Sequence, residues 1–457
     1  MNLVWFKITD LRIKDHSALK SAFNKKKSDT LLIFCLDPYF FQNMRFGHIK
    51  FDRYKQKFLF QSIINLYDNI KKNEGHLNIY LDSPENVIPK LVSKYNIKNI
   101  YHILDTTVEE TNKLDKIIEN SKDVTINSYW DNTLYHISDL PFEVKDMPYI
   151  FTNFRKEVSK LKFRDERTVN LSRLKKSVYD VDNINTIIEK NNMLKIDLLF
   201  EGGEDKAWER LNYYFYEKQL LSDYKKTRNG LLGKDYSSKL SPYLAFGNIS
   251  AKSILNQIKK YEQEIEKNDS TYWLYFELLW RDFFRFSSLK YGNKIFKLGG
   301  IKNKILEWRK NDEETLLLFN KWKNGQTGYP YIDANMIEMK ETGFMSNRGR
   351  QMVASFLVKD LKIDWRLGAE YFESMLIDYD VASNYGNWNY SAGIGADPRE
   401  NRYFNVYKQG YTYDRNCKFI LKWIPELKIY KNDNIINVKS LTNYKKPIVY
   451  IKKYSKS

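Results

Sequence analysis

The spacing of apolar residues changes along the chain, and this change constrains the fold most. Five short apolar runs lie near the start, at 3–6, 31–36, 77–81, 97–103 and 124–128. Polar stretches with helical spacing, such as Lys57 to Ile70 and Glu85 to Tyr95, separate them. Strands that alternate with helices in this way are typical of a parallel sheet covered on both faces. An α/β domain of Rossmann-like class is therefore predicted for the first part of the chain.

The pattern after Gly202 is helical throughout. Apolar residues recur at helical spacing through 207–221, 250–265, 271–286, 313–322, 330–340, 347–361 and 367–377. The stretch between the two parts has little periodicity, contains Pro141 and Pro148, and is predicted to be a connector over the surface. The expected organisation is an α/β domain (1–135), a connector (136–201), a helical domain (202–430) and a basic, loosely held C-terminal tail (431–457).

Length, charge and cysteine content narrow the class of protein. With 457 residues the chain is too long for one core. A net charge of +18 suggests a polyanionic partner such as nucleic acid. The alternative is that the charge reflects a lysine-rich composition of the whole protein, because lysine is spread along the entire chain. The two cysteines exclude a disulfide framework and a four-cysteine iron–sulfur cluster held by this chain alone, and no metal is expected. No secretory signal and no run long enough to span a bilayer is found, so a cytoplasmic protein without a membrane partner is expected.

The run LIDYDVASNYGNWNYSAGIG, residues 376–395, has the densest set of polar and aromatic side chains. Asp378 and Asn384 could flank a planar polar ligand if the chain turns between them, with Trp365 and Trp388 lining its pocket or passing electrons to it. A turn-rich packing corner is the alternative, since Asp and Asn also satisfy their own backbone and tryptophans fill cores.

Two further stretches carry candidate chemistry. The loop from Ser237 to Pro242 offers hydroxyls, backbone N–H groups and Lys239 to a pyrophosphate, particularly if a helix begins at Pro242; a simple helix cap is the alternative. Glu277, Trp280, Arg281 and Phe284 share one helix face. Because Glu277 and Arg281 stand among aromatic residues, a buried, functional charged pair is the preferred interpretation. The alternative is an exposed pair within the helix, which would stabilise the helix by only about 0.3–0.5 kcal/mol.

Four long sequence motifs, which follow one another along the chain in the same order as in a known family, show what the chain resembles. They are YFELLWRDFFRF (275–286), GQTGYPYIDANM (325–336), TGFMSNRGRQMVASFLVKDL (342–361) and DWRLGAEYFESMLIDYDVASNYGNWNYSAGIGADPREN (364–401). The sequence resembles the cryptochrome/photolyase family, and within it the DASH-type cryptochromes. The resemblance implies a photolyase fold, in which an α/β domain precedes an all-α domain that binds FAD in a U-shaped conformation.

The resemblance also implies roles for single residues. The FAD ligands it implies are Tyr224, Ser237, Ser238, Leu240, Ser241, Arg281, Arg350, Asp378, Asp380 and Asn384, with Asn384 facing the flavin N5. The residues it assigns to damaged DNA are Glu277, Trp280, Asn347, Arg348, Gln351 and Tyr390; plain surface solvation is the alternative for Arg348. Trp388 and Trp365 match the inner members of an electron chain, and either Trp308 or Trp322 could be its outer member.

A second pigment is expected in the α/β domain. No G-x-G-x-x-G motif follows the first strand, so no dinucleotide is placed there by motif. The resemblance implies 5,10-methenyltetrahydrofolate as antenna, held by Glu109 or Glu110. An ordinary helix N-terminus, where acids favour the dipole, explains these two residues equally well.

The expected function is blue-light-driven, FAD-dependent repair of cyclobutane pyrimidine dimers by a monomeric deoxyribodipyrimidine photo-lyase. Gln351 and Tyr390 stand where other photolyases have Met and Trp, and this more polar pocket favours single-stranded DNA, because flipping a dimer out of duplex costs a few kcal/mol. The main alternative is a blue-light photoreceptor that binds DNA and signals or regulates transcription without repair. A flavin-free DNA- or RNA-binding module would fit the charge but leaves the polar residues of the flavin site unexplained.

Overall fold

The N-terminal domain is built on a five-stranded parallel sheet. The computed structural model describes residues 1–24, 29–399, 402–438 and 441–452. The strands lie in the order β3-β2-β1-β4-β5, and every neighbouring pair is parallel. Their bounds are β1 (Asn2–Phe6), β2 (Thr30–Cys35), β3 (Leu77–Tyr80), β4 (Asn99–Ile103) and β5 (Thr125–Tyr129). Because the strand order reverses between β1 and β4, a crevice is expected outside the carboxyl ends of these two strands.

Helices cover both faces of the sheet, as the sequence predicted. Side chains alternate along β1, so that Leu3 and Trp5 pack in one apolar cluster and Val4 and Phe6 in another. The first cluster includes residues of α3 and α4, and the second includes residues of α1 and α2. The helix bounds are α1 (Ser17–Asn24), α2 (Arg53–Lys72), α3 (Pro84–Tyr95) and α4 (Val108–Glu119).

The second domain is helical, and no β-strand occurs in the described residues after Gly202. Its helices are α7 (Glu204–Asn212), α8 (Tyr224–Thr227), α9 (Ser241–Ala245), α10 (Ala251–Glu264), α11 (Asp269–Tyr291), α12 (Glu313–Lys323), α13 (Pro330–Thr342), α14 (Asn347–Ser355), α15 (Trp365–Met375), α16 (Val381–Ala392), α17 (Val406–Tyr413), α18 (Lys418–Trp423) and α19 (Asn432–Asn437). The predicted helices 207–221 and 347–361 each end earlier and continue as a π-helical turn, Tyr213–Glu217 and Phe356–Asp360.

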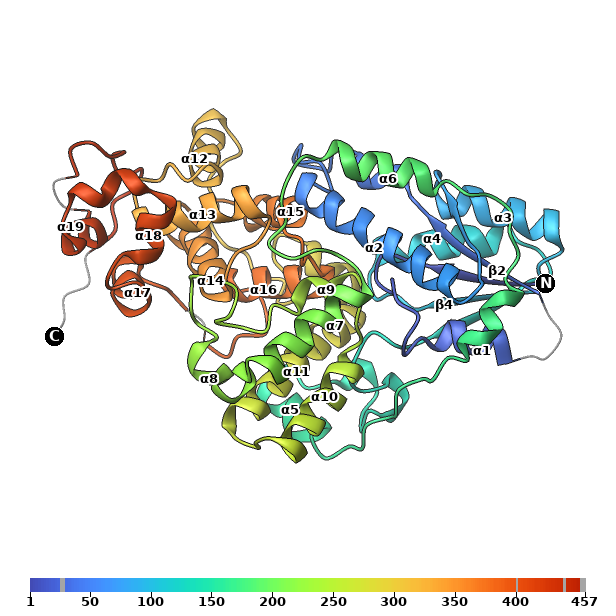
Figure 1. Cartoon of the computed structure of the whole chain (residues 1–457). Helices are drawn as coiled ribbons and strands as arrows, with labels where there is room; N and C mark the ends of the chain where they lie inside the picture. The colour runs from blue at the N-terminus through green and yellow to red at the C-terminus, as the bar shows by residue number, and fades with distance from the viewer. Residues whose placement is uncertain (25–28, 400–401, 439–440, 453–457) are drawn as a thin grey trace.

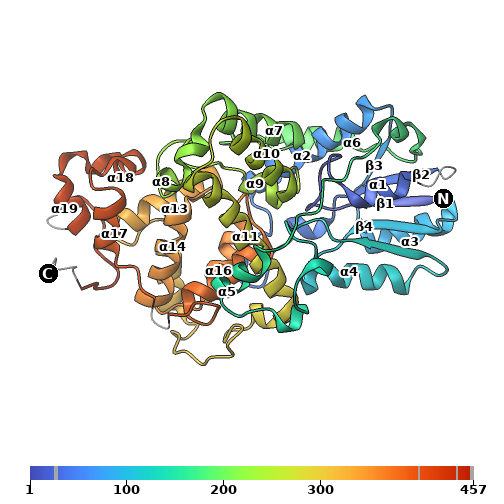
Figure 2. The same ribbon diagram turned by 90° about the horizontal axis from the view of Figure 1, so that it is seen from below.

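The connector does more than run over the surface. It contains α5 (Phe151–Val158), which packs on α11, and α6 (Ile184–Met193), which packs on α2. Phe151, Phe154 and Val158 are buried, so α5 belongs to the core of the helical domain. In Figures 1 and 2, α11 and α16 lie in the middle of the molecule, with the sheet on one side and α17 to α19 on the other.

The loop after β1 joins the two domains. Its Leu11 N–H donates to Phe246 O (3.1 Å), the Arg12 Nη1 donates to Gly247 O (3.1 Å), and the Asn248 Nδ2 donates to Leu11 O (3.1 Å). Gly247 has φ +61°, a backbone conformation that side chains rarely adopt. The junction therefore depends on close backbone contact at this glycine.

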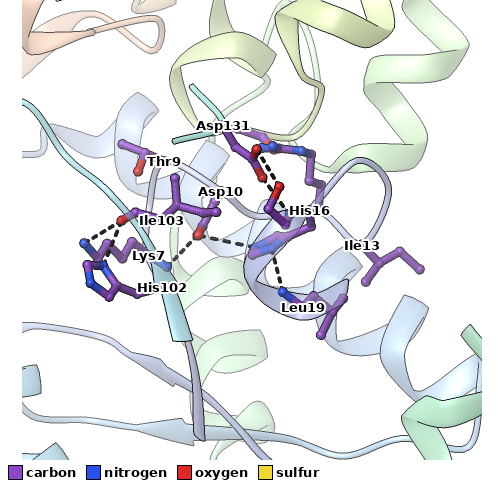
Figure 3. Close-up of polar contacts among 12 residues, drawn as sticks. Lys7, Thr9, Asp10, Ile13, His16, Leu19, His102, Ile103 and Asp131 are labelled. Atoms are coloured by element: carbon purple, nitrogen blue, oxygen red, sulfur yellow. Dashed lines mark hydrogen bonds and ion pairs between the residues drawn. The ribbon is translucent and has the colours of Figure 1, made fainter. Parts of the chain in front are cut away.

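The same loop is held internally by buried charge. Asp10 accepts a hydrogen bond from the Lys7 N–H (2.6 Å) and lies 3.3 Å from the His16 Nε2, and Figure 3 shows its carboxylate between these two groups. The Asp10 and His16 side chains are fully buried. The buried Asp10 carboxylate thus faces a backbone donor on one side and the His16 ring on the other.

The prediction of a loosely held tail is wrong for its described residues. Ile435, Ile436 and Ile451 are buried, and the Tyr444 hydroxyl donates to the Asp333 carboxylate (2.6 Å). Residues 439–440 and 453–457 of the predicted tail lie outside the described residues. None of the helices that the structure describes is long and apolar enough to cross a membrane.

Candidate functional site

Three cavities meet around the start of α16. The main cavity, about 280 Å³, lies between the 236–245 segment, α11 and α14; a second of about 120 Å³, here the inner cavity, adjoins it between α14 and α16. The interdomain cavity, about 110 Å³, lies at the carboxyl ends of β1 and β2 and reaches the helical domain at Phe246 and Tyr379. Asp380 lines all three cavities.

The serine-rich loop forms one wall of the main cavity. A helix follows it at once, as the pyrophosphate interpretation requires: α9 begins at Ser241, with Pro242 in its first turn. Ser237, Ser238, Leu240 and Ser241 all line the cavity. This wall offers hydroxyl and backbone donors to an anionic group, the chemistry that a diphosphate requires.

Lys239 does not serve as a free cation in this wall. It is 3% exposed, and its Nζ lies over the rings of Tyr236 (3.5 Å) and Phe344 (4.2 Å). Burial lowers the pKa of this ammonium group well below its ordinary value. Lys239 itself lines the main cavity, with its amino group against two aromatic faces, so its contact with a pyrophosphate stays a prediction.

Arg350 and Asp378 form an ion pair between the main and inner cavities. The Arg350 Nη2 lies 2.8 and 2.9 Å from the two Asp378 carboxylate oxygens, and the Ser241 hydroxyl donates to the same carboxylate (2.7 Å). Both charged residues line both cavities. The pair predicted from the sequence is thus present, and the Arg350 side chain is 25% exposed.

Asp380 is the most strongly stabilised carboxylate of the site. It caps α16 by accepting from the Ser383 N–H (2.9 Å), and the Arg285 Nη2 lies 2.5 Å away. Arg281 is more distant, at 4.0 Å. Burial raises the pKa of Asp380, but Arg285 and Arg281 together hold it below its ordinary value. Asp380 is therefore a fixed negative charge at neutral pH.

Arg281 is held mainly by backbone carbonyls. It lines the main cavity and donates to Leu244 O (3.3 Å) and to Asn132 O. Burial and the nearby Arg285 lower the pKa of Arg281 to about 10. The side chain is therefore still protonated at neutral pH, as a cation facing an anionic ligand must be.

Asn384 lines the inner cavity. Its Nδ2 donates to Ala369 O (3.1 Å), which leaves the amide oxygen as its acceptor for a ligand. Asn347 lines both cavities, and Gln351 lines the inner one. Arg348 donates to Gln351 (2.8 Å) and to Asn229 (3.1 Å), so it lies beside the site and does not line either cavity.

Glu277 and Trp280 lie together on α11 and line the main cavity. Glu277 is paired with the Arg228 guanidinium (2.5 Å), a contact that the sequence did not indicate. Burial raises the pKa of Glu277, while Arg228 opposes this change. The Trp280 ring stacks on Phe151 (3.7 Å, 9°), and Tyr390 meets its edge at 6.3 Å.

The tryptophans form a buried aromatic cluster behind the inner cavity. Trp388 and Trp365 are 2% and 0% exposed, and only Trp388 lines the cavity. Trp322 meets the Trp388 ring at 6.5 Å and is fully buried, whereas Trp308 is half-buried. Trp308 thus reaches the surface and Trp322 does not, while the place of either in an electron chain stays a prediction.

Ion pairs surround the interdomain cavity. The Lys50 Nζ lies 2.6 Å from Glu109 and 2.5 Å from Glu373, so it joins α4 to the end of α15. Glu110 accepts from the Thr107 side chain and N–H in a capping box, while also lining the cavity. Burial raises the pKa of Glu110. Helix capping and ligand contact are thus compatible for this residue.

Three contacting residues were missed from the sequence, namely Phe151, Arg228 and Arg285. Phe151 begins α5 and covers one face of the Trp280 ring. Arg285 follows Arg281 by one helical turn, and a second cation in an aromatic stripe was the signal that could have indicated it. No such local signal exists for Arg228, whose partner Glu277 lies 49 positions away.

Comparisons with known proteins agree with this geometry. A family model described as "DNA photolyase" matches residues 2–171, and one described as "FAD binding domain of DNA photolyase" matches residues 273–457. "Cryptochrome DASH" of Synechocystis sp. is 45% identical over 95% of this chain and 89% of its own length. "Cryptochrome DASH, chloroplastic/mitochondrial" of Arabidopsis thaliana is 42% identical over 94% of this chain and 76% of its own.

A solved structure supports the same assignment. The crystal structure of a Synechocystis sp. cryptochrome superposes with a TM-score of 0.91 at 41% identity, covering 98% of this chain and 96% of its own. The predicted photolyase fold is thereby confirmed. The chain belongs to the photolyase/cryptochrome family, within its DASH cryptochromes, and carries that family's FAD-binding domain.

Proposed function

We propose that this protein is a light-driven DNA photolyase that splits cyclobutane pyrimidine dimers, preferentially in single-stranded DNA. Membership of the photolyase family implies DNA binding. The observation that carries the finer proposal is that Glu277 and Trp280 line the main cavity beside the Arg350–Asp378 pair, with Tyr390 at the edge of the Trp280 ring. An aromatic wall, a carboxyl group and a fixed ion pair suit a flat lesion next to a charged cofactor.

The residues present fit FAD. The serine loop would hold the diphosphate, and Arg350, Asp378, Asp380, Arg281 and Asn384 would surround the ring system. Reduced FAD, when bound and excited by blue light, supplies an electron that the dimer accepts and later returns. The Arg350 cation favours negative charge nearby, and the Asn384 amide oxygen offers an acceptor for a ring N–H. Tyr224, on α8, is buried and lines the main cavity.

Glu277 is the proposed hydrogen-bond donor to the lesion. A carboxyl group donates a hydrogen bond only when protonated, and burial favours this form by raising its pKa. Arg228 opposes protonation by its 2.5 Å ion pair. A phosphate of the lesion strand that draws Arg228 away would therefore release Glu277 for a carbonyl of the dimer. Trp280 offers the lesion the face that Phe151 leaves uncovered.

The test uses photoreduced protein with ultraviolet-damaged oligothymidylate, single-stranded and duplex, under blue light and in the dark. Light-dependent dimer loss is expected on the single strand. Glu277→Ala should slow it roughly 10- to 100-fold, the scale of one hydrogen bond to a charged group. Glu264→Ala is the matched control, because Glu264 is 53% exposed on α10 and pairs only loosely with Lys260 (3.9 Å). Equal rates for both variants would remove Glu277 from the mechanism.

A blue-light photoreceptor that binds DNA without repairing it is the second candidate. The close Arg228–Glu277 pair favours it, since this pair stabilises the carboxylate form of Glu277. No dimer loss by a protein with bound, photoreducible flavin would put this candidate first.

The interdomain cavity is the proposed site of a folate antenna, with Glu109 or Glu110 at its edge. Two observations support this site: the cavity lies at the carboxyl ends of the parallel strands, and acidic residues line it. Titration with 5,10-methenyltetrahydrofolate, followed by its near-ultraviolet absorption, tests this. Glu110→Gln or Glu109→Gln should weaken binding, and absence of binding by the unaltered protein would exclude the antenna.

A further inference from the structure

The first turns of α11 form an aromatic rim beside the main cavity. Tyr272 is 39% exposed and Trp273 is half-buried. Trp273 precedes Glu277 by four positions and Trp280 by seven, so all three lie on one face of the helix. With a rise of about 1.5 Å per residue, the Trp273 ring lies roughly 10 Å along α11 from the Trp280 ring. A strand whose lesion contacts Trp280 would therefore pass this rim.

Cations lie between the rings of the rim. The Lys225 Nζ lies 4.9 Å from the centre of the Trp273 ring, and the Arg228 guanidinium lies 5.9 Å from it. On the other side, the Arg155 Nη1 donates to the Tyr272 hydroxyl (2.7 Å). Lys225 and Arg228 come from α8 and the residue after it, and Arg155 comes from α5, so two segments converge on the start of α11.

Not every cation here is neutralised. Lys225 pairs with Asp269 (2.8 Å), and Arg228 pairs with Glu277. Among the described residues, neither Arg155 nor its exposed neighbour Lys156 forms an ion pair with a carboxylate. Their charge is therefore available to a ligand. Aromatic rings alternating with available cations are the arrangement that binds single-stranded nucleic acid, in which bases stack and phosphates pair.

We propose that Tyr272, Trp273, Arg155 and Lys156 form a docking surface for the single-stranded DNA that flanks the lesion. Unpaired bases stack on the exposed Tyr272 ring and contact the edge of the Trp273 ring, on which Phe276 already stacks at 4.9 Å, and the phosphates contact the two cations. Bases in a duplex are already stacked and paired, so they cannot offer their faces to this rim without opening. The surface rests on the proposed function for its ligand and adds a physical source for the single-strand preference.

The test measures binding of a labelled, undamaged single-stranded oligothymidylate by fluorescence anisotropy in the dark. Tyr272→Ala and Trp273→Ala should each weaken binding about 5- to 100-fold, the range of one lost base–aromatic stack. Tyr272→Phe and Trp273→Phe should restore it. Tyr179→Ala is the matched control, because Tyr179 is 59% exposed in the connector and, within the described part of the chain, its ring meets only that of His76. Binding of the duplex should not change in any variant.

The cations have a separate readout. Arg155→Gln and Lys156→Gln should each lower the slope of log affinity against log salt by about 0.7, the value for one phosphate contact of a single strand. Unaltered affinity in Tyr272→Ala would overturn the proposal. So would equal losses on the single strand and the duplex.

The assay also separates this surface from repair. The probe carries no dimer and the measurement needs no light. Loss of single-strand binding in the Ala variants, in a protein that splits no dimers, would support the surface and refute repair. Dimer repair by a protein whose single-strand binding is unaffected by these variants would support repair and refute the docking surface.

Discussion

Replacing Gly247 by alanine should loosen the junction between the two domains. A Cβ at this position would lie 1.9 Å from the carbonyl oxygen of Thr9, closer than real Cβ atoms approach, so the loop must move. That movement disturbs the three hydrogen bonds between the loop after β1 and residues 246–248. At about 1 kcal/mol each, they contribute about 3 kcal/mol. The positive φ of +61° adds about 1–2 kcal/mol for a residue with a side chain.

The expected loss in the free energy of unfolding is therefore about 4–5 kcal/mol, measured by urea denaturation. Gly233→Ala is the matched control. Gly233 also has a positive φ, +82°, but nothing lies within 4 Å of its added Cβ. This variant should lose only the conformational part, about 1–2 kcal/mol. Equal losses in the two variants would refute the role given to the close contact at Gly247.

Three further perturbations test the site and its surroundings. Arg285→Met should lower the free energy of unfolding in urea by about 3–5 kcal/mol, because it leaves the Asp380 carboxylate buried without its close partner. If adding Asp380→Asn to this variant recovers none of the loss, the ion-pair argument fails. Burial raises the pKa of Glu204 to about 7 from 4.5, so the folded protein holds this proton more tightly than the unfolded chain does. Stability should then fall by about 3 kcal/mol as pH rises from 4.5 to 7, and Glu204→Gln should flatten this part of the urea-midpoint profile. An unchanged profile in the variant would contradict it. Phe151→Ala should destabilise the protein by about 3–5 kcal/mol and shift Trp280 emission to the red, since water then reaches the ring; emission like that of the unaltered protein would mean that Phe151 does not shield it.

The sequence predicted the elements of the fold well because their apolar spacing is regular. The predicted run 31–36 is β2 (Thr30–Cys35), and the predicted helix 313–322 is α12 (Glu313–Lys323). The two π-helical turns were missed, since one extra residue in a turn hardly alters the apolar period. The packed C-terminal segment was missed because Ile435, Ile436 and Ile451 stand among lysines and asparagines, and local composition hides single buried residues.

The site was predictable where one helix carries it. Glu277, Trp280 and Arg281 follow from helical spacing, and all three line the main cavity. Contacts between distant segments were not predictable in this way. The Arg285–Asp380 pair joins positions 95 apart, and only the packing of α11 against α16 brings them together.

The position of Asp380 has a thermodynamic consequence. One carboxylate lines the interdomain cavity as well as the two cavities proposed for FAD, and the buried Arg285 beside it lines the interdomain cavity too. A ligand in either place that changes the electrostatic environment of this ion pair therefore also changes the environment of a ligand in the other place. Linkage then requires that occupancy of the interdomain cavity alter the dissociation constant of the flavin by the same factor as the flavin alters that of the interdomain ligand. The two pigments would be cooperative ligands, of either sign, even without touching each other.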